Sequence, residues 1–275
     1  MLGRSFVALM LMLSLSFSIN LVSPAVNDLE NGGVVDLGTI GPGQTVYIQI
    51  DPVVTEGGIH GIGGRYDEAI AENLPRGWKS EKSKLYQDPL QVTITADPDA
   101  PEGNYSAVVT VIDEGNGELL GNVSFIVKVR ITWDVMDFGV SPSYKIVGPG
   151  QPARFSITVT NKGSTSDVFQ VSTTGPKRWE FVKPVFVPAH TTKKFYYEIV
   201  GEEEETYSST VKVVSLASDN IADEKNVTIF VQSNLLGDYR ATNNGVIIFP
   251  IFEAPIYAAA GLISAVVEGT ASLFH

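Results

Sequence analysis

One four-residue sequence, Gly-Pro-Gly-Gln, occurs twice in this chain, at residues 41–44 and at residues 148–151. Each copy leads into a run of alternating apolar and polar residues, at 46–50 and 155–159. Further landmarks recur in the same order at a spacing of about a hundred residues, the usual size of one domain. The pairs are Trp78 and Trp179, Asn104-Tyr105-Ser106 and Thr206-Tyr207-Ser208, and Asn122-Val123-Ser124 and Asn226-Val227-Thr228. This ordered repetition predicts two copies of one folding unit.

The two units share a period-two pattern of apolar residues. Val46, Ile48 and Ile50 alternate with polar residues in the first unit, and residues 227–231 follow the same pattern in the second. This alternation is typical of strands with one buried face. Segments rich in Gly, Pro, Asn and Asp, such as residues 97–103, separate the runs. About seven short strands per unit with regular turns predict an all-β chain of two tandem antiparallel β-sandwiches.

Apolar stretches lie at both ends of the chain. Arg4 precedes the apolar residues 6–13, and small residues follow at 23–25, a pattern typical of a secretory signal peptide. Residues 6–22 also approach the length of an uncleaved membrane anchor, and both interpretations place the rest of the chain outside the cytoplasm. The predicted layout is a signal peptide at 1–25, sandwiches at 26–132 and 133–233, a linker at 234–245 and a hydrophobic segment at 246–275.

The C-terminal segment is the strongest candidate for attachment. Residues 246–267 contain one charged residue, Glu253, and two prolines. Their length suits a helical membrane anchor, although Glu253 at mid-depth would cost about 2.5–3.5 kcal/mol. The alternatives are that residues 246–249 add as a strand to a partner's sheet edge, or that the segment packs on its own domains. The candidate contact side chains are Val246, Ile247, Ile248, Phe249, Ile251, Phe252, Ile256, Leu262, Ile263, Val266 and Val267.

Composition excludes several classes of function. The net charge of −12 would repel phosphate backbones, so nucleic acid is excluded as a partner. The chain has no cysteine, which excludes disulfides and thiol nucleophiles. His60, His190 and His275 are scattered and belong to no catalytic motif, and the glycine-rich residues 57–64 lack the spacing of a phosphate-binding loop. We therefore predict that the protein is not an enzyme and holds no cofactor or metal.

Three asparagines begin Asn-x-Ser/Thr sequences and are candidate N-glycosylation sites, namely Asn104, Asn122 and Asn226. The strand alternation places Asn122 and Asn226 on outward-facing positions. Trp78 and Trp179 occupy the same place in both units, so we expect them to pack in the core; the alternative is that they stack on sugars. Glutamates 202–205 are expected to form a solvated turn.

These landmarks resemble those of prokaryotic Ig-like domains from archaeal and bacterial cell-surface and S-layer proteins, a kind also appended to glycosidases. The resemblance rests on Pro-Gly-Gln at 42–44 and 149–151, Gly-Trp at 77–78, Gly-Asn-Tyr at 103–105, Asn-Lys-Gly at 161–163, Pro188 and Thr-Tyr at 206–207. The first unit lacks the Asn-x-Gly turn, and Arg178 replaces the glycine before Trp179. The resemblance implies two tandem Ig-like antiparallel β-sandwiches with a non-catalytic surface role.

The expected function is therefore that of an exported cell-envelope protein. In this interpretation the sandwiches form a spacer or binding stalk, attached to the membrane or to an envelope protein through residues 246–275. One alternative is a self-associating subunit of a surface filament or layer, assembled by inserting its tail into a neighbour. The other is an accessory carbohydrate-binding module whose partners are glycans.

Overall fold

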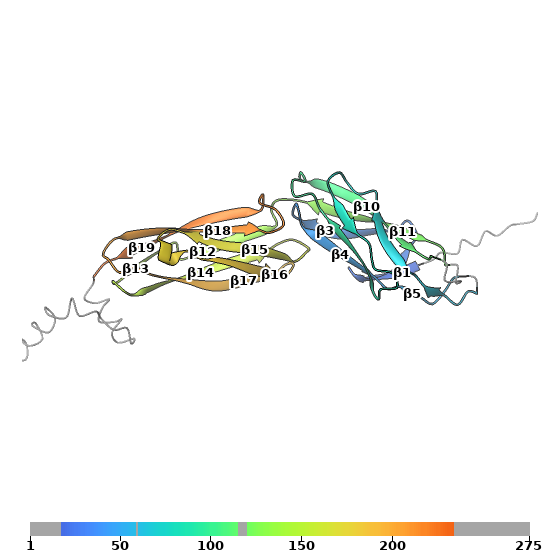
Figure 1. Ribbon diagram of the computed structural model, residues 1–275, viewed down its shortest axis with the longest axis horizontal. Coiled ribbons are helices and arrows are strands. Elements are labelled where there is room, and N and C mark those ends of the chain that lie inside the picture. The colour runs from blue at the N-terminus through green and yellow to red at the C-terminus, as the bar shows by residue number, and fades with distance from the viewer. Residues whose placement is uncertain (1–17, 59, 115–119, 234–275) are drawn as a thin grey trace, which may run out of the picture.

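The computed structural model describes residues 18–58, 60–114 and 120–233 (Figure 1). These residues form strands and turns, with one short 3-10 turn at Lys177–Trp179. The strands build two sandwiches that follow one another along the long axis of the molecule (Figure 1). The prediction of an all-β chain with antiparallel sheets is confirmed.

The first sandwich has two layers. One layer contains, in spatial order, β2 (Val26–Glu30), β1 (Ser18–Ser23), β4 (Thr45–Ile50), β9 (Leu90–Thr95) and β8 (Lys79–Glu81). The other contains β3 (Val34–Ile40), β11 (Val123–Ile131), β10 (Gly103–Ile112) and β7 (Glu68–Glu72). The glycine-rich insertion carries a small hairpin of β5 (Val53–Val54) and β6 (Gly64–Arg65). Neighbouring strands are antiparallel except β3, which runs parallel to β11.

The second sandwich repeats this plan. One layer contains β12 (Met136–Ser141), β14 (Pro152–Asn161) and β17 (Thr192–Val200). The other contains β13 (Tyr144–Val147), β19 (Ala222–Val231), β18 (Thr206–Ser215), β15 (Asp167–Thr174) and β16 (Val182–Val187). Strand β13 runs parallel to β19, as β3 does to β11. The strand orders are those of Ig-like sandwiches.

One strand joins a different layer in the two sandwiches. In the first, β8 pairs with β9. In the second, the strand between the equivalent neighbours, β16, pairs instead with β15 in the opposite layer. The repeat in the sequence therefore corresponds to a repeat in structure with one edge strand exchanged between the sheets.

Each sandwich has its own hydrophobic core, built from the inward-facing residues of both layers. Phe125 is fully buried in the first core, and Phe155 and Phe169 are fully buried in the second. Val46, Ile48 and Ile50 point inward, as their alternation predicted. Burying each such side chain contributes about 1.5–3 kcal/mol, so the two cores can stabilise the sandwiches separately.

The structure corrects the boundary between the predicted signal peptide and the first sandwich. Strand β1 lies inside the predicted segment 1–25, pairs with β2 and β4, and buries Ile19 (1% exposed) and Leu21 (3% exposed) in the core. Cleavage after residue 25 would remove this strand, so the first sandwich begins by Ser18. Residues 1–17 lie outside the described residues, and a signal peptide there stays a prediction.

The sequence contains a sign of this strand. Ser23-Pro24 stands at the end of β1, and Ser141-Pro142 stands at the end of β12, the strand in the equivalent place of the second sandwich.

Of the predicted C-terminal elements, the linker at 234–245 and the hydrophobic segment at 246–275 lie outside the described residues. Within the described part of the chain, no helix has the length and apolar character required to cross a membrane.

Candidate functional site

The Gly-Pro-Gly-Gln turns have the same internal hydrogen bond in both sandwiches. Gln44 Oε1 accepts a hydrogen bond from the N–H of Gly41 at 2.7 Å, and Gln151 Oε1 accepts one from the N–H of Gly148 at 3.2 Å. In each turn the glutamine carbonyl closes the loop and leaves the amide nitrogen Nε2 pointing elsewhere. The glutamine therefore recurs because it holds the turn together.

The second glycine of each turn has a backbone conformation that favours glycine. Gly43 has φ 70° and Gly150 has φ 73°, in the left-handed region where a Cβ atom is strained. The N–H of Gly43 donates to Asp97 O at 3.1 Å, and that of Gly150 donates to Gly201 O at 2.8 Å. The turns are thus equivalent in conformation and in their contact with the loop beside them. We call the end of each sandwich that carries this turn its lower end.

The lower end of the first sandwich contacts the upper end of the second. Gln44 Nε2 donates to Asp167 Oδ2 at 2.7 Å, and the hydroxyl of Ser215 donates to the same oxygen at 2.8 Å. Gln44 is only 2% exposed, and Asp167 is buried. A buried carboxylate is costly unless its oxygens accept hydrogen bonds. This pair therefore joins the sandwiches by a specific contact, which we call the joint.

Further hydrogen bonds across the joint use backbone groups of the first sandwich. Thr39 N donates to Ser164 Oγ at 2.9 Å, and Thr39 O accepts from Ser164 N at 2.7 Å. Thr165 Oγ1 donates to Thr45 O at 2.7 Å, and Ser218 Oγ donates to Pro98 O at 2.9 Å. These directional contacts, spread over several loops, oppose rotation of one sandwich against the other.

The backbones of the two sandwiches also approach each other closely at the joint. A Cβ atom added to Gly43 would lie 1.9 Å from Ala217 O of the second sandwich, and one added to Gly38 would lie 2.2 Å from Ser164 Oγ. No real Cβ atom approaches another atom so closely, so the two sandwiches would have to separate. Glycine is therefore required here by the joint as well as by the local backbone.

The chain passes from the first sandwich to the second at Thr132 and Trp133, and hydrogen bonds hold this connection in place. Glu102 Oε1 accepts hydrogen bonds from the Thr132 hydroxyl and, at 3.0 Å, from the N–H of Trp133. These two bonds lower the pKa of the Glu102 carboxyl below its ordinary value, with a smaller contribution from Arg130. The connection between the sandwiches is thus held by side-chain hydrogen bonds.

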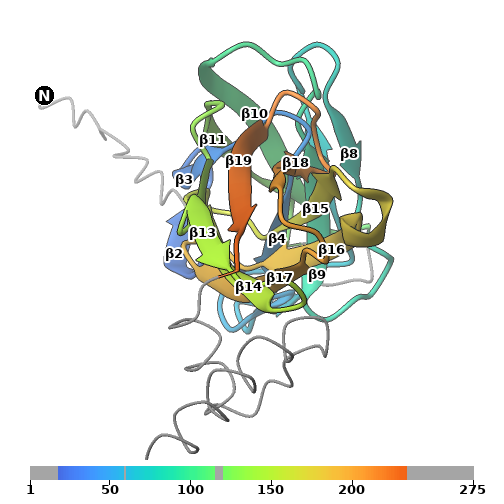
Figure 2. The same ribbon diagram turned by 90° about the vertical axis from the view of Figure 1, so that its left-hand side faces the viewer.

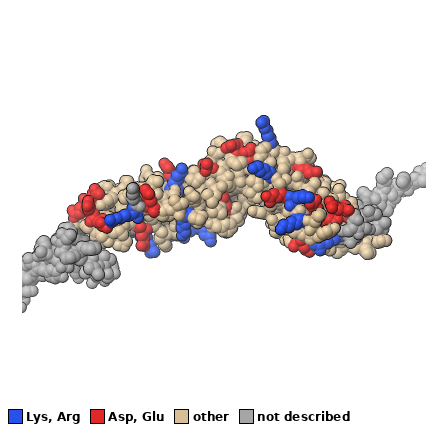
Figure 3. Space-filling model, in the orientation of Figure 1, with Lys and Arg blue, Asp and Glu red and all other residues tan. Residues whose placement is uncertain are grey.

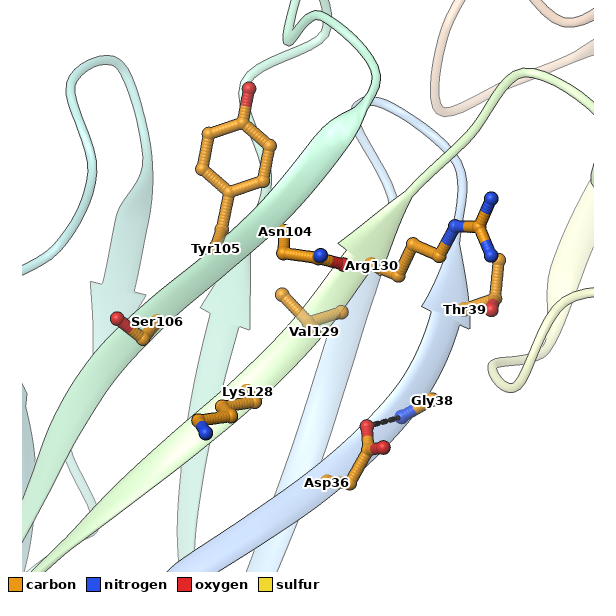
Figure 4. Close-up of a pocket in the computed structure, with 9 residues that line it drawn as sticks. All are labelled: Asp36, Gly38, Thr39, Asn104, Tyr105, Ser106, Lys128, Val129 and Arg130. Atoms are coloured by element: carbon orange, nitrogen blue, oxygen red, sulfur yellow. Dashed lines mark hydrogen bonds between the residues drawn. The ribbon is translucent and has the colours of Figure 1, made fainter.

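A polar groove of about 580 Å³ lies on the outer face of β3, β10 and β11, next to the joint (Figure 4). Its lining residues are Asp36, Gly38, Thr39, Asn104, Tyr105, Ser106, Lys128, Val129 and Arg130. Register places Lys128 between Ser106 and Asp36, and Arg130 between Asn104 and Thr39. Hydroxyl, amide, carboxylate and cationic groups thus share one surface, which suits a hydroxyl-rich ligand with an acidic group.

The groove carries a local positive charge on an acidic protein. Among the residues that the structure describes, neither Lys128 nor Arg130 forms an ion pair within 4.0 Å. Asp36 is the acidic residue in the lining, and its Oδ1 accepts a hydrogen bond from Gly38 N at 2.8 Å. Sequence reasoning missed both cations because three strands distant in sequence bring the lining together.

The three sequon asparagines, Asn104, Asn122 and Asn226, are exposed. Asn104 lines the groove (Figure 4). Asn122 is the residue directly before β11. Asn226 lies on the outer face of β19, where its Oδ1 accepts a hydrogen bond from Thr210. Each is accessible to a glycan, and modification stays a prediction. The apolar side chains proposed for attachment, within residues 246–267, lie outside the described residues.

The repeated aromatic residues pack rather than present a flat surface. Trp78 contacts Tyr105 at a ring-centroid distance of 5.3 Å, and Trp179 contacts Tyr207 at 5.0 Å. Each tyrosine hydroxyl donates to a backbone carbonyl four residues earlier, at Pro101 for Tyr105 and at Glu203 for Tyr207. Trp78 is buried and Trp179 half-buried. This packing matches the core expectation and weakens the sugar-stacking alternative.

The other residues considered for chemistry do not come together. His60 lies in the loop between β5 and β6, and His190 lies in the turn between β16 and β17. His275 is outside the described residues. In the described part of the chain, no group of three or more His, Cys, Asp or Glu side chains is placed to hold a metal ion. The absence of catalysis stays a prediction.

The sequence matches no family model and no curated protein. Among solved structures, a titin fragment aligns at 8% identity over 74% of this chain and 98% of its own, with a TM-score of 0.28. A CARDB domain from Pyrococcus furiosus, solved in complex with di-metal ions, aligns at 17% identity over 36% of this chain and 91% of its own, with a TM-score of 0.27. For a β-glucosidase from Listeria innocua, the alignment covers 35% of this chain and 16% of the enzyme, at 16% identity and a TM-score of 0.25. The Ig-like description therefore rests on the strand order of the chain itself.

Proposed function

We propose that this protein is a non-catalytic, exported component of a prokaryotic cell envelope, whose two sandwiches act as a spacer or binding stalk. The joint carries this proposal. A spacer must keep its ends apart at a fixed angle, and the buried contact between Gln44 and Asp167, with its surrounding hydrogen bonds, resists bending between the sandwiches. A flexible tether between independent modules would need no such contact.

The remaining support comes from the sequence. The apolar stretches at residues 6–13 and 246–267 suit export and attachment, and the acidic surface with interspersed basic residues (Figure 3) suits an exposed, non-aggregating body. Attachment through residues 246–275 to the membrane or to an envelope protein follows from their length and hydrophobicity. Tail insertion into a neighbouring copy, as in a surface filament, remains the alternative use of the same segment.

Fractionation of producing cells tests the attachment. Membranes carrying the full chain are washed at high salt and high pH, and the protein is followed by immunoblot. We expect the full chain to stay with the membranes and a variant lacking residues 246–275 to appear in the soluble fraction. Release of the full chain by the washes would exclude an integral anchor. Retention of the truncated variant would show that another part of the chain attaches it.

The groove favours a second candidate function, that of an accessory module for acidic saccharides. Asp36, Ser106 and Asn104 can hydrogen-bond sugar hydroxyls, and Lys128 and Arg130 can bind a sugar carboxylate or sulfate. The groove replaces the tryptophans as the basis for this function, since those side chains pack within the sandwiches.

A glycan array measures this directly, using the full chain from a host that does not glycosylate, so that Asn104 is unmodified. We expect the variant K128E/R130E to lose at least about tenfold in affinity for acidic glycans. A charge-assisted hydrogen bond contributes about 1.5–3 kcal/mol, and about 1.4 kcal/mol is a factor of ten. K193E/K194E, which makes the same charge change at exposed sites of the second sandwich, should bind normally. Equal binding by all three proteins would reject the groove, and no binding by the unsubstituted chain would reject this function.

A further inference from the structure

The lower end of the second sandwich repeats the surface that forms the joint in the first. Gln151 closes its turn as Gln44 does, and Gly150 contacts Gly201 as Gly43 contacts Asp97. Figure 2 looks along the molecule from this end, where β13 and the neighbouring ends of β14, β17 and β19 face the viewer. Strand β13 is the edge strand of its sheet, as β3 is in the first sandwich. One copy of the surface is therefore an interface, and the other has no second sandwich against it in the described chain.

Apolar side chains are exposed near this end of the second sandwich. Val200, the residue before Gly201, is 42% exposed. Ile146 of β13 is 64% exposed and Tyr144 is also exposed. Exposed apolar side chains can take part in interaction surfaces. Both sheets of the second sandwich therefore expose apolar side chains near its lower end, on β13 and at the end of β17.

The hydrogen bond that Gln44 makes across the joint has no counterpart at this end. Gln44 Nε2 donates to Asp167, but Gln151 Nε2 has no hydrogen-bond partner among the described residues. The first sandwich uses the side chains of Gln44 and Asp99 in the joint, the latter accepting from Asn220 Nδ2 at 3.5 Å. Its hydrogen bonds with Ser164, Thr165 and Ser218 use backbone groups. Because backbone groups are present whatever the side chains are, the lower end of the second sandwich has the same kinds of donors and acceptors, although its strand β13 has no glycine in the place of Gly38.

We propose that the lower end of the second sandwich docks the upper end of a further Ig-like domain, in the same head-to-tail manner as the joint. This inference rests on the proposed role as a spacer and identifies its partner. The partner presents a carboxylate in the place of Asp167, with Ser or Thr hydroxyls beside it that donate to backbone carbonyls. Acidic side chains at this end, including glutamates 202–205, favour Lys, Arg or amide groups on its facing loops, although Glu202 is already paired with Arg178.

An identical second copy is a poorer partner. Asp67 precedes β7 in the first sandwich as Asp167 begins β15 in the second. Asp67, however, is fully buried within its own sandwich, where its Oδ2 accepts a hydrogen bond from Glu114 N at 2.7 Å. The upper end of the first sandwich therefore does not offer this carboxylate to another chain. The partner is a domain whose upper end resembles that of the second sandwich, which is already used within this chain.

The chain itself provides the probe. A second copy of residues 132–231 is inserted into the full chain after Val231, which ends β19 as Ile131 ends β11. Small-angle scattering and NMR relaxation then report whether the added sandwich moves with the rest. We expect one fixed end-to-end length and a common tumbling time for all three sandwiches. An added sandwich that reorients independently would overturn the proposal.

Two variants identify the contact. Gln151→Ala removes the glutamine donor, and the change equivalent to Asp167→Ala in the added copy removes only its acceptor, leaving the turn at 148–151 intact. Both should give a broad length distribution and loss of common tumbling, and unchanged rigidity in the second variant would contradict the proposed contact. Gln170→Ala, on a strand away from either end, is the control.

The chain's own residues 234–275 are the competing occupant of this end. Hydrogen exchange at the amide of Gln151 is compared in the unmodified chain with and without these residues. We expect equal exchange rates. Strong protection that disappears on truncation would show that the segment covers the surface and would overturn the docking proposal. Membrane fractionation tests attachment separately, so docking and attachment can fail independently.

Discussion

Removing residues 1–25 is expected to unfold the first sandwich, whereas removing residues 1–17 should leave it folded. Strand β1 lies between β2 and β4 and buries Ile19 and Leu21 in the core. Loss of one such side chain costs about 2–5 kcal/mol, and the whole stability of a domain is about 5–15 kcal/mol. Losing two, together with the hydrogen bonds of a central strand, removes most or all of that stability.

Calorimetry distinguishes the two truncations, because the sandwiches have separate cores. The chain that starts at residue 18 should keep the unfolding transitions of the full chain. The chain that starts at residue 26 should lose the transition of the first sandwich and retain that of the second. If both truncated chains melt alike, β1 is not part of the stable fold and the boundary at residue 25 stands.

Gly43→Ala is expected to separate the two sandwiches. The substitution places a Cβ atom 1.9 Å from Ala217 O, across the joint. It also strains a backbone with φ 70°, which costs about 1–2 kcal/mol. The local strain can be accepted by the turn, but the clash with a backbone oxygen is relieved only when the second sandwich moves away. The hydrogen bond between Gln44 and Asp167 is then lost as well.

Gly150→Ala is the matched control. Its φ of 73° gives the same local strain, but this turn lies at the other end of the second sandwich, away from the joint. We expect both variants to lower the melting temperature of their own sandwich, and only Gly43→Ala to broaden the length distribution in small-angle scattering and to uncouple the tumbling of the sandwiches. Uncoupling by Gly150→Ala to the same degree would show that strain in the turn, and not the clash, is responsible.

Much of the fold follows from patterns that are local in the sequence. Alternation at Val46, Ile48 and Ile50 determines which face of a strand is buried, because successive side chains point to opposite faces. Gly43 and Gln44 predict a turn, because the required backbone angle and the closing hydrogen bond involve residues three positions apart or fewer. These features repeat in the second unit for the same reasons.

The pairing of distant segments was beyond that reasoning. From the sequence alone, the apolar residues of β1 are assigned to the end of a signal peptide. Their place in the sandwich is evident only from the pairing of β1 with β2 and β4. The joint depends on Gln44 and Asp167, which are 123 positions apart, and neither residue has a local feature that predicts the other. The groove likewise depends on the register of three strands, which places Lys128 and Arg130 beside Asp36 and Asn104.

By itself, the sequence determined that the chain is all-β, that it contains two related units, and that both units close with the same turn. Only the tertiary structure decided that β8 and β16 join opposite layers, that β1 belongs to the first core, and that one of two equivalent turns is an interface. The physical reason is one of range. Side-chain alternation and turn geometry are set by neighbours in the chain, whereas strand partners and domain contacts are chosen by the total area and hydrogen bonding of surfaces that meet only after folding.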